Sequence, residues 1–390
     1  GKNVVGVGGI IHFNTTTLND DLWGFSGSIG PAADGRIKPD LCFWYDSIRT
    51  TAPGSSYTSS FGGTSAACPE TAGHFGLFFQ MWADGLFGNP VSGGSVFEER
   101  PHSSTARAVM INTATAYNFS GTGADLTRVH QGWGRPDVGR LYDLRDNMLV
   151  VDETDVLTAL QSRTYVSHVT PALANHDELR VTLTYNDPAG TTSAGQHRIN
   201  DMTLKVTSPG GTIYYGNNGL LAGNWSTSGG SPNTIDTVEN VFIPNPQAGA
   251  WTIEVTAAEI NQDGHIQTGA VDMDYALVIS GGAPGTDCNE NDVPDPCDIS
   301  CAPTGCAIAG CGQSNDCNTN GIPDECEEPD CNGNSIPDEC ELDGNDCNTN
   351  GIPDDCELAG NDCNGNQVPD DCDEATLAET LTGPVDTTPC

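Results

Sequence analysis

The residue with the clearest potential for chemistry is Ser65, which ends the stretch Gly62-Gly63-Thr64-Ser65. A long apolar run follows it to about Leu86 and predicts a helix that is buried on nearly all sides. A serine at the start of a helix has its own backbone N–H free to meet a developing oxyanion, and the helix dipole favours negative charge there. A nucleophilic serine also needs a base within about 3 Å, so the histidines decide what Ser65 can do.

The eight histidines of the chain offer no such base. His74 lies on the same predicted helix as Ser65, at a distance of roughly 13 Å along the axis. His12 is predicted to be a solvated loop residue. The others are expected at the surface or in loops: His102, His130, His168, His176, His197 and His265. The sequence therefore predicts a nucleophile without a basic partner inside the chain.

A second pattern with chemical potential is the repeat Asp-Cys-Asn-x-Asn-x-[Ile/Val]-Pro-Asp-x-Cys-[Glu/Asp]. Oxygen-bearing side chains fall at its positions 1, 3, 5, 9 and 12, and position 7 offers a backbone carbonyl, which is the ligand spacing of an EF-hand loop. Hard oxygen ligands suit Ca²⁺. The cysteines lack the Cys-x-x-Cys spacing of zinc sites. A solvated acidic linker is the alternative, but it explains neither the recurring asparagines nor the acid at position 12.

Five copies of the repeat predict five calcium loops. Position 6 is glycine only at Gly321 and Gly351, whereas Asp292, Ser335 and Gln367 replace it and should weaken their loops. The predicted ligands, loop by loop, are Asp287, Asn289, Asn291, Val293, Asp295 and Asp298; Asp316, Asn318, Asn320, Ile322, Asp324 and Glu327; Asp330, Asn332, Asn334, Ile336, Asp338 and Glu341; Asp346, Asn348, Asn350, Ile352, Asp354 and Glu357; Asp362, Asn364, Asn366, Val368, Asp370 and Asp373.

Charge and cysteine are both concentrated in the last part of the chain. Its 390 residues carry a formal net charge of −39. The segment from Pro284 to Cys390 contains 26 Asp and Glu residues and no Lys or Arg, so it contributes −26 of that charge. Such a chain has no basic surface for nucleic acid, and its regular acidic array points to cations as partners. Fourteen of the 16 cysteines lie in the same segment, which predicts disulfides and an exported protein.

The chain contains no apolar run of 18 residues, so no membrane span is predicted. It opens on Gly1 without an initiator methionine, and we expect it to be a piece of a longer protein that is secreted, or attached to the cell surface through a further part.

The periodicity of the sequence divides the chain into four segments. Residues 1–147 mix short buried strands with helices, one of which should run from a Ser103 cap to Thr113. Residues 150–282 alternate apolar and polar side chains between glycine and proline turns, which predicts an antiparallel all-β sandwich or barrel. Residues 287–373 hold the repeats, and residues 374–390 are a linker or truncated tail.

The first segment resembles the C-terminal part of the catalytic domain of subtilisin-like serine peptidases. Gly63-Thr64-Ser65-x-Ala67-x-Pro69 is similar to the nucleophile motif of that family. Supporting stretches are Lys2–Gly9, Phe25–Ser28 with Asp34–Asp40, and Gln131–Gly134, so that the resemblance covers about 140 residues. It implies an α/β subtilisin-like fold, a polypeptide substrate and an acyl-enzyme mechanism. Ser65 would be the nucleophile, and Gly63 and Thr64 would form its turn.

In that family the catalytic aspartate, the histidine and the oxyanion asparagine precede the strand that starts here at Lys2, and no matching motif occurs in this chain. The stretch Leu41–Tyr45 departs from the family pattern, and a bridge between Cys42 and Cys68 stays open.

Two further resemblances concern the later segments. Asn200–Gly211, Glu239–Ile243 and Ala248–Val255 are similar to the β-barrel of the alkaline, oxidatively stable subtilase branch, with a jelly-roll-like sandwich fold. Asp187, Asn200 and Asp201 could hold a calcium ion there, although turn capping is the commoner role. The closely spaced repeats leave no room for flanking helices and resemble thrombospondin type 3 repeats.

The leading interpretation is a secreted serine endopeptidase with a calcium-binding stalk. The alternative is a non-enzymatic, calcium-dependent adhesion or matrix protein on a decayed peptidase scaffold.

Overall fold

The computed structural model describes residues 1–120, 124–169, 178–281, 283–284, 289, 291, 293, 295–301, 310–319, 322–327, 329–362, 365, 367–370 and 372. The chain divides into two compact units, Gly1–Gly285 and Thr286–Cys390. Across the described ranges, no helix has both the length and the apolar character needed to cross a membrane.

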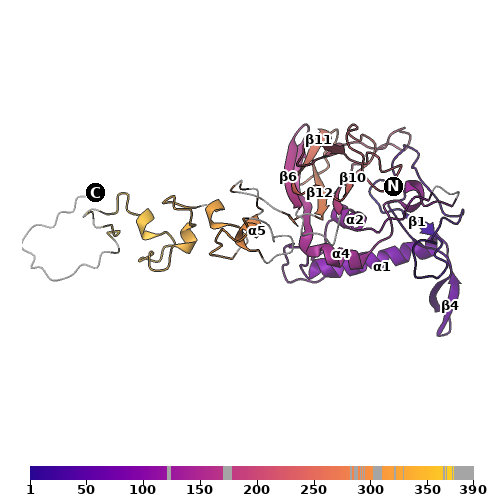
Figure 1. Cartoon of the computed structure of the whole chain (residues 1–390), viewed down its shortest axis with the longest axis horizontal. Coiled ribbons are helices and arrows are strands. Elements are labelled where there is room, and N and C mark those ends of the chain that lie inside the picture. The colour runs from indigo at the N-terminus through magenta and orange to yellow at the C-terminus, as the bar shows by residue number, and fades with distance from the viewer. Residues whose placement is uncertain are drawn as a thin grey trace, which may run out of the picture. The chain divides into compact units, whose positions relative to one another are not determined.

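The first unit begins with an α/β part. Strand β1 (Val7–Ile10) pairs in parallel with β2 (Leu41–Trp44), and the hairpin of β3 (Ile48–Ala52) and β4 (Ser56–Phe61) follows. The hairpin leads into the long helix α1 (Thr64–Ala83), which contacts β1 and β2 (Figure 1). The shorter helices of this part are α2 (Ser103–Asn112), α3 (Arg128–Gln131), α4 (Val138–Leu144) and the 3₁₀ turn η1 (Arg145–Asn147).

Helix α1 is buried on one side only. Phe78 and Trp82 lie in the core, whereas Gly73, Gly76 and Leu77 are exposed, and Leu77 retains 58% of its accessible surface. The prediction of a helix buried on nearly all sides is therefore wrong for this unit. The apolar run is continuous in the sequence, but the elements that contact α1, namely β1, β2 and α4, bury only one of its faces.

Helix α2 connects the α/β part to the β-sheets. It starts at Ser103, and the cap residue is His102, so the predicted Ser103 cap is misplaced by one residue. The Asn112 side chain at its end donates to the carbonyls of Arg180 (3.1 Å) and Val278 (3.2 Å). These bonds attach the helix to two neighbouring strands, and they explain why an asparagine is kept in a fully buried position.

Two antiparallel sheets enclose the second core of this unit. One has the order β10-β7-β12-β5 and the other β13-β6-β11-β8-β9. Side chains from both sheets, such as Val181, Leu204 and Ile253, form one buried cluster. The strands are β5 (Met148–Thr158), β6 (Ser162–Val169), β7 (Glu178–Thr184), β8 (Asp201–Thr207), β9 (Ile213–Tyr215), β10 (Val238–Pro244), β11 (Gly249–Glu259), β12 (Asp272–Ser280) and β13 (Ala283–Pro284).

The second unit repeats one short motif. After helix α5 (Asp295–Ile299), positions 9 to 11 of successive repeats form the 3₁₀ turns η2 (Asp324–Cys326), η3 (Asp338–Cys340) and η4 (Asp354–Cys356). The protein thus combines a mixed α/β unit that contains several sheets with a disulfide-bonded C-terminal unit, which agrees with the multi-domain expectation at this level.

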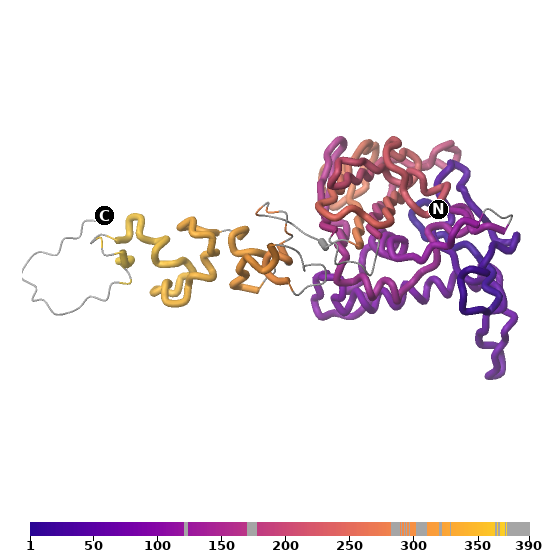
Figure 2. The backbone as a smooth tube through the Cα atoms, in the orientation of Figure 1, coloured from indigo at the N-terminus to yellow at the C-terminus, as the bar shows by residue number. Residues whose placement is uncertain are grey.

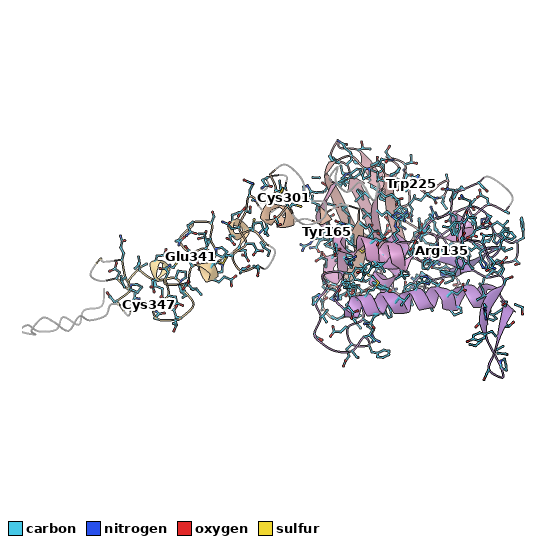
Figure 3. The ribbon with its side chains drawn as sticks, turned by 60° about the horizontal axis from the view of Figure 1, so that its bottom comes forward. Arg135, Tyr165, Trp225, Cys301, Glu341 and Cys347 are labelled. Carbon is cyan, nitrogen blue, oxygen red and sulfur yellow. A yellow bond between two sulfur atoms is a disulfide. The ribbon has the colours of Figure 1, made fainter. Side chains whose placement is uncertain are left out.

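Disulfides join successive repeats. The bonds Cys317–Cys340, Cys331–Cys356 and Cys347–Cys372 each link position 2 of one repeat to position 11 of the next. Figure 3 labels Cys347, at position 2 of the fourth repeat. A further bond, Cys301–Cys311, lies before the second repeat. Cys42 and Cys68 are free, so the bridge left open between them does not form.

The disulfide register gives a direct test of the second unit. Digestion of the oxidised chain without reductant, followed by mass spectrometry, is expected to recover linked peptides containing Cys317 with Cys340 and Cys331 with Cys356. Recovery of Cys331 linked to Cys340, a bond within one repeat, would contradict the register.

Candidate functional site

Ser65 lies in the first turn of α1, and a glycine pair sets its position. Gly63 has φ +76°, a backbone conformation that favours glycine, and its N–H donates to the Tyr45 carbonyl (2.6 Å). A Cβ on Gly62 would lie 2.6 Å from that same oxygen. Both glycines are therefore required for the chain to turn from β4 into the helix with Ser65 at its start.

The Ser65 side chain is exposed. Among the residues described, it has no hydrogen-bond partner, and none of the described histidines is hydrogen-bonded to it. The first N–H groups of a helix have no intrahelical acceptor, so this turn offers backbone donors beside the hydroxyl. The arrangement provides a hydroxyl and a site for negative charge, but no histidine in the described part of the chain is hydrogen-bonded to Ser65.

His74 has another role. Its Nδ1 donates to the Glu70 carbonyl one turn earlier in α1 (2.8 Å), and its ring packs against Phe43 with the centroids 5.0 Å apart. The prediction that His74 does not serve Ser65 agrees with this geometry.

A buried histidine–carboxylate pair lies near the same helix, and the sequence did not predict it. His12 is 7% exposed, its Nδ1 lies 2.7 Å from Asp46 Oδ1, and its ring stacks on Trp44 at 4.9 Å. The prediction of a solvated His12 is therefore wrong. His168, expected at the surface, is also buried, because it lies within strand β6.

Glu70, in α1, faces this pair. Burial raises the pKa of the Glu70 carboxyl to about 7; the negative charge of Asp46 adds to this effect, and His12 opposes it. Its Oε2 is buried without a hydrogen-bond partner in the described part of the chain. An acid of this kind favours its neutral form in the folded protein.

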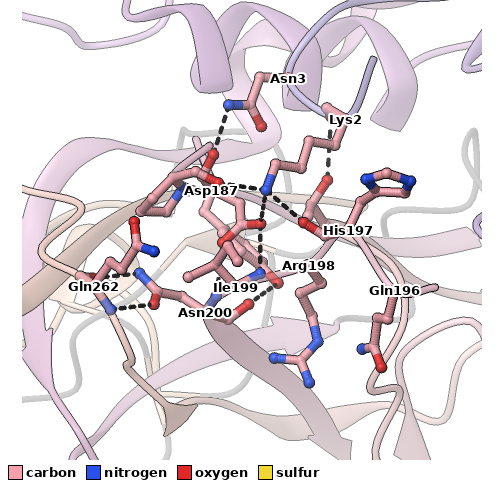
Figure 4. Close-up of polar contacts among 12 residues, drawn as sticks. Lys2, Asn3, Asp187, Gln196, His197, Arg198, Ile199, Asn200 and Gln262 are labelled. Atoms are coloured by element: carbon pink, nitrogen blue, oxygen red, sulfur yellow. Dashed lines mark hydrogen bonds and ion pairs between the residues drawn. The ribbon is translucent and has the colours of Figure 1, made fainter. Parts of the chain in front are cut away.

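A lysine binds Asp187, one of the three residues of the possible calcium site in the sandwich. Lys2 Nζ binds the Asp187 carboxylate (2.5 Å) and the carbonyls of His197 (2.7 Å) and Pro188, which brings the start of the chain against the sandwich loops (Figures 2 and 4). Asp187 also accepts the N–H groups of Ile199 (2.9 Å) and Asn200 (2.7 Å). The ammonium group thus supplies positive charge at Asp187.

Asn200 caps a turn. Its Oδ1 accepts the N–H groups of Asn261 (2.9 Å) and Gln262 (3.1 Å), which is the commoner role noted for such residues. Asp201 lies apart from these bonds, with its Oδ1 3.7 Å from Arg198 Nε.

The repeat loops bring several of the predicted ligands together. In the third loop, Asp330 Oδ1 (3.2 Å) and Asn332 Oδ1 (3.0 Å) both accept the N–H of Asn334. The Nδ2 groups of Asn332 (2.9 Å) and Asn334 (2.6 Å) in turn donate to the two carboxylate oxygens of Glu341. Positions 1, 3, 5 and 12 therefore converge.

The fourth loop repeats this pattern. Asp346 and Asn348 both accept the Asn350 N–H at 3.0 Å. Asn348 (3.2 Å) and Asn350 (2.7 Å) donate to Glu357. The same contacts in two loops indicate that the arrangement belongs to the repeat and not to one copy of it.

Position 9 takes part in a different set of contacts. The carboxylates of Asp324 and Asp338 accept the position 2 N–H groups of Cys317 and Cys331 (2.8 Å each), and Asp354 does the same for Cys347 (3.0 Å). The position 9 N–H also donates to the carbonyl just before each repeat, as from Asp338 to Pro329 (2.9 Å). Position 9 therefore closes the loop.

The backbone at position 6 agrees with the predicted need for glycine. Ser335 (φ +66°), Gln367 (φ +67°) and Gly351 (φ +85°) all adopt the left-handed conformation, which is costly for the two residues that carry a Cβ. Five predicted ligands lie outside the described residues: Asp287, Asn320, Asn364, Asn366 and Asp373.

Comparison with known proteins finds a family model that is similar to the segment containing the Ser65 turn. Residues 2–134 match the subtilase family (Peptidase_S8). The Serine protease/ABC transporter B family protein tagA of Dictyostelium discoideum is 24% identical over 276 residues, which cover 63% of this chain and 15% of that protein. The chain thus spans about a seventh of that relative's length. These matches support the subtilisin-like prediction for this segment, and peptidase chemistry at the level of the family.

A solved structure of the Bacillus licheniformis lipase BlEst2 in its propeptide form aligns with a TM-score of 0.20 and 13% identity, covering 37% of this chain and 24% of that one. A likeness this low carries no argument about the fold.

The pKa of Glu70 predicts a pH-dependent stability. Because the folded-state pKa is raised to about 7 from an unfolded value near 4.5, the folded protein binds more protons between these values, and stability falls as the pH rises through this window. Glu70→Gln is expected to raise the melting temperature more at pH 8 than at pH 5. Asp143→Asn, at an exposed position of α4, is the control. An equal effect of Glu70→Gln at both pH values would refute the raised pKa.

Proposed function

We propose that this chain contributes the nucleophile of a secreted serine endopeptidase. Ser65 would attack the scissile carbonyl carbon through Oγ, form an acyl-enzyme and release it by hydrolysis. The observation that carries the proposal is an exposed serine at a helix N-terminus, on a turn that Gly62 and Gly63 make possible, inside the segment that matches the subtilase family.

The base would come from residues outside this sequence. The Ser65 hydroxyl has no contact with a histidine in the described ranges, and the subtilase motifs that carry the aspartate, histidine and oxyanion asparagine have no counterpart here. The exposed face of α1, which includes Gly73, Gly76 and Leu77, is available for such a segment to pack against. His12 with Asp46 is not assigned this role, because His12 is buried, stacks on Trp44 and, among the described residues, makes no hydrogen bond to Ser65.

We further propose that the second unit is a calcium-binding stalk and that the protein works outside the cell. Positions 1, 3, 5 and 12 of each loop would hold Ca²⁺ together with the position 7 carbonyl, and the position 9 acid would close the loop. The convergence of those side chains in two loops supports this assignment, and the disulfides between repeats suit an oxidising compartment.

Peptide hydrolysis tests the enzymatic proposal. The 390-residue chain is expected to cleave a peptide substrate no faster than background, because Ser65 lacks a base. The protein expressed with the coding sequence upstream of Gly1 should be active, and Ser65→Ala in that protein should abolish activity without lowering its melting temperature, since the side chain is exposed. An inactive longer protein would favour the non-enzymatic adhesion protein, and an active Ser65→Ala variant would show that another residue is the nucleophile.

Calorimetric titration of the oxidised chain with Ca²⁺ and Mg²⁺ tests the stalk. We expect at least three Ca²⁺ per chain, with dissociation constants on the order of 10⁻⁴ to 10⁻³ M as in extracellular modules. The loops with glycine at position 6, which start at Asp316 and Asp346, should fill first. Fewer than three bound ions, or an equal response to Mg²⁺, would defeat the assignment.

A further inference from the structure

One acidic position of the repeat is not among the predicted ligands. Position 10 holds Glu325, Glu339 and Asp355 in the second, third and fourth repeats. Each of these carboxylates accepts a hydrogen bond from the position 3 asparagine of the preceding repeat: Asn289 to Glu325 (2.9 Å), Asn318 to Glu339 (2.5 Å) and Asn332 to Asp355 (2.9 Å). The same pairing at three successive junctions makes it a property of the repeat.

The same asparagines also contact the position 12 acid of their own loop. Asn318 Nδ2 donates to Glu327 (3.1 Å) and Asn332 Nδ2 to Glu341 (2.9 Å). Two carboxylates from two different repeats therefore meet at one amide group. Like charges brought this close repel each other, so the junction favours a cation between them.

The disulfides fix this junction covalently. In the bond Cys317–Cys340, the two cysteines directly neighbour Asn318 at position 3 and Glu339 at position 10. The bond Cys331–Cys356 has the same relation to Asn332 and Asp355. The carboxylate of the later repeat is thus held beside the earlier loop.

The sequence of the repeats independently supports a contact between position 10 and the preceding loop. An acid stands at position 10 in every repeat that follows another one, whereas the first repeat, which has no loop before it, has Pro296 there. A role within its own repeat would require the acid in the first copy as well. The pattern matches a role toward the preceding loop.

We propose that the position 10 carboxylate of each repeat completes the calcium site of the preceding loop. This inference rests on the proposed calcium-binding function. In the loaded site the position 3 amide would present its oxygen to the ion, since the oxygen and nitrogen of an asparagine are assigned only from their hydrogen bonds. The loop's own acids at positions 1 and 12 balance the charge of Ca²⁺, and the third carboxylate comes from the next repeat, so that neighbouring loops bind in a coupled way.

Hydrogen exchange measured by mass spectrometry resolves the loops in the full chain. The oxidised protein is titrated with Ca²⁺, and the midpoint of protection is read for residues 316–327 and 330–341 separately. Glu339→Gln keeps a hydrogen-bond acceptor but removes the charge. It is expected to raise the midpoint of loop 316–327 about tenfold and to leave loop 330–341 unchanged. Asp355→Asn should move the effect to loop 330–341.

The control is Asp343→Asn, which removes one charge from an exposed residue between the third and fourth repeats. It should shift neither midpoint. If Glu339→Gln shifts no loop, or shifts both equally, the position 10 carboxylate does not complete the preceding site, and simple calcium loops remain. If no loop of the parent protein responds to Ca²⁺, the calcium-binding function itself fails, and this inference fails with it.

Discussion

The first unit depends on buried arginines that cross between its α/β part and its sheets. Arg107 Nη2 donates to the Tyr185 carbonyl (2.8 Å), Arg128 Nε to Leu220 (2.9 Å) and Arg180 Nη1 to Ala114 (2.9 Å). Burial lowers the pKa of Arg128 to about 9 and that of Arg180 to about 10. A charged group is tolerated at such depth only when its donors are satisfied. Either part alone would leave these donors without the carbonyls that they bind across the boundary, which favours one compact unit.

This constraint extends to the Ser65 turn. Arg107 also binds the Lys2 carbonyl, just before β1, and β1 with β2 supports α1. The turn itself could be predicted from the sequence, because Gly62 and Gly63 determine it locally. The environment of His12 could not be predicted from the sequence, because its burial depends on Trp44 and Asp46, which lie more than thirty residues later in the chain. The exposure of one face of α1 was equally unpredictable, because an apolar run does not reveal which elements will pack against it.

In the second unit, the repeated sequence made it possible to predict the loops. The repeat alone did not indicate which acid of each copy lies near a neighbouring repeat. Every copy has acids at positions 9 and 12, and every copy except the first also has one at position 10, so an EF-hand template assigns position 9 to the ion. In the proposed site, the choice between positions 9 and 10 depends on which acid contacts the preceding repeat, as Glu339 does through Asn318. That choice follows from the pairing of position 2 with position 11 across repeats, such as Cys331 with Cys356, and cysteine spacing alone does not determine the pairing.

The two units balance buried or clustered negative charge in different ways. In the first unit, basic side chains of the protein balance the negative charge. Lys2 Nζ binds the Asp187 carboxylate, and Arg180 Nε lies 2.7 Å from Glu178 Oε2. The second unit has no Lys or Arg between Pro284 and Cys390, yet its disulfides hold carboxylates of successive repeats together. In the proposed calcium-binding function, the positive charge that would stabilise these junctions would come from solution. A cation bound between two repeats would reduce the repulsion at the points where the disulfides bring the repeats together, so that the charge balance and the covalent register of the stalk depend on the same contacts.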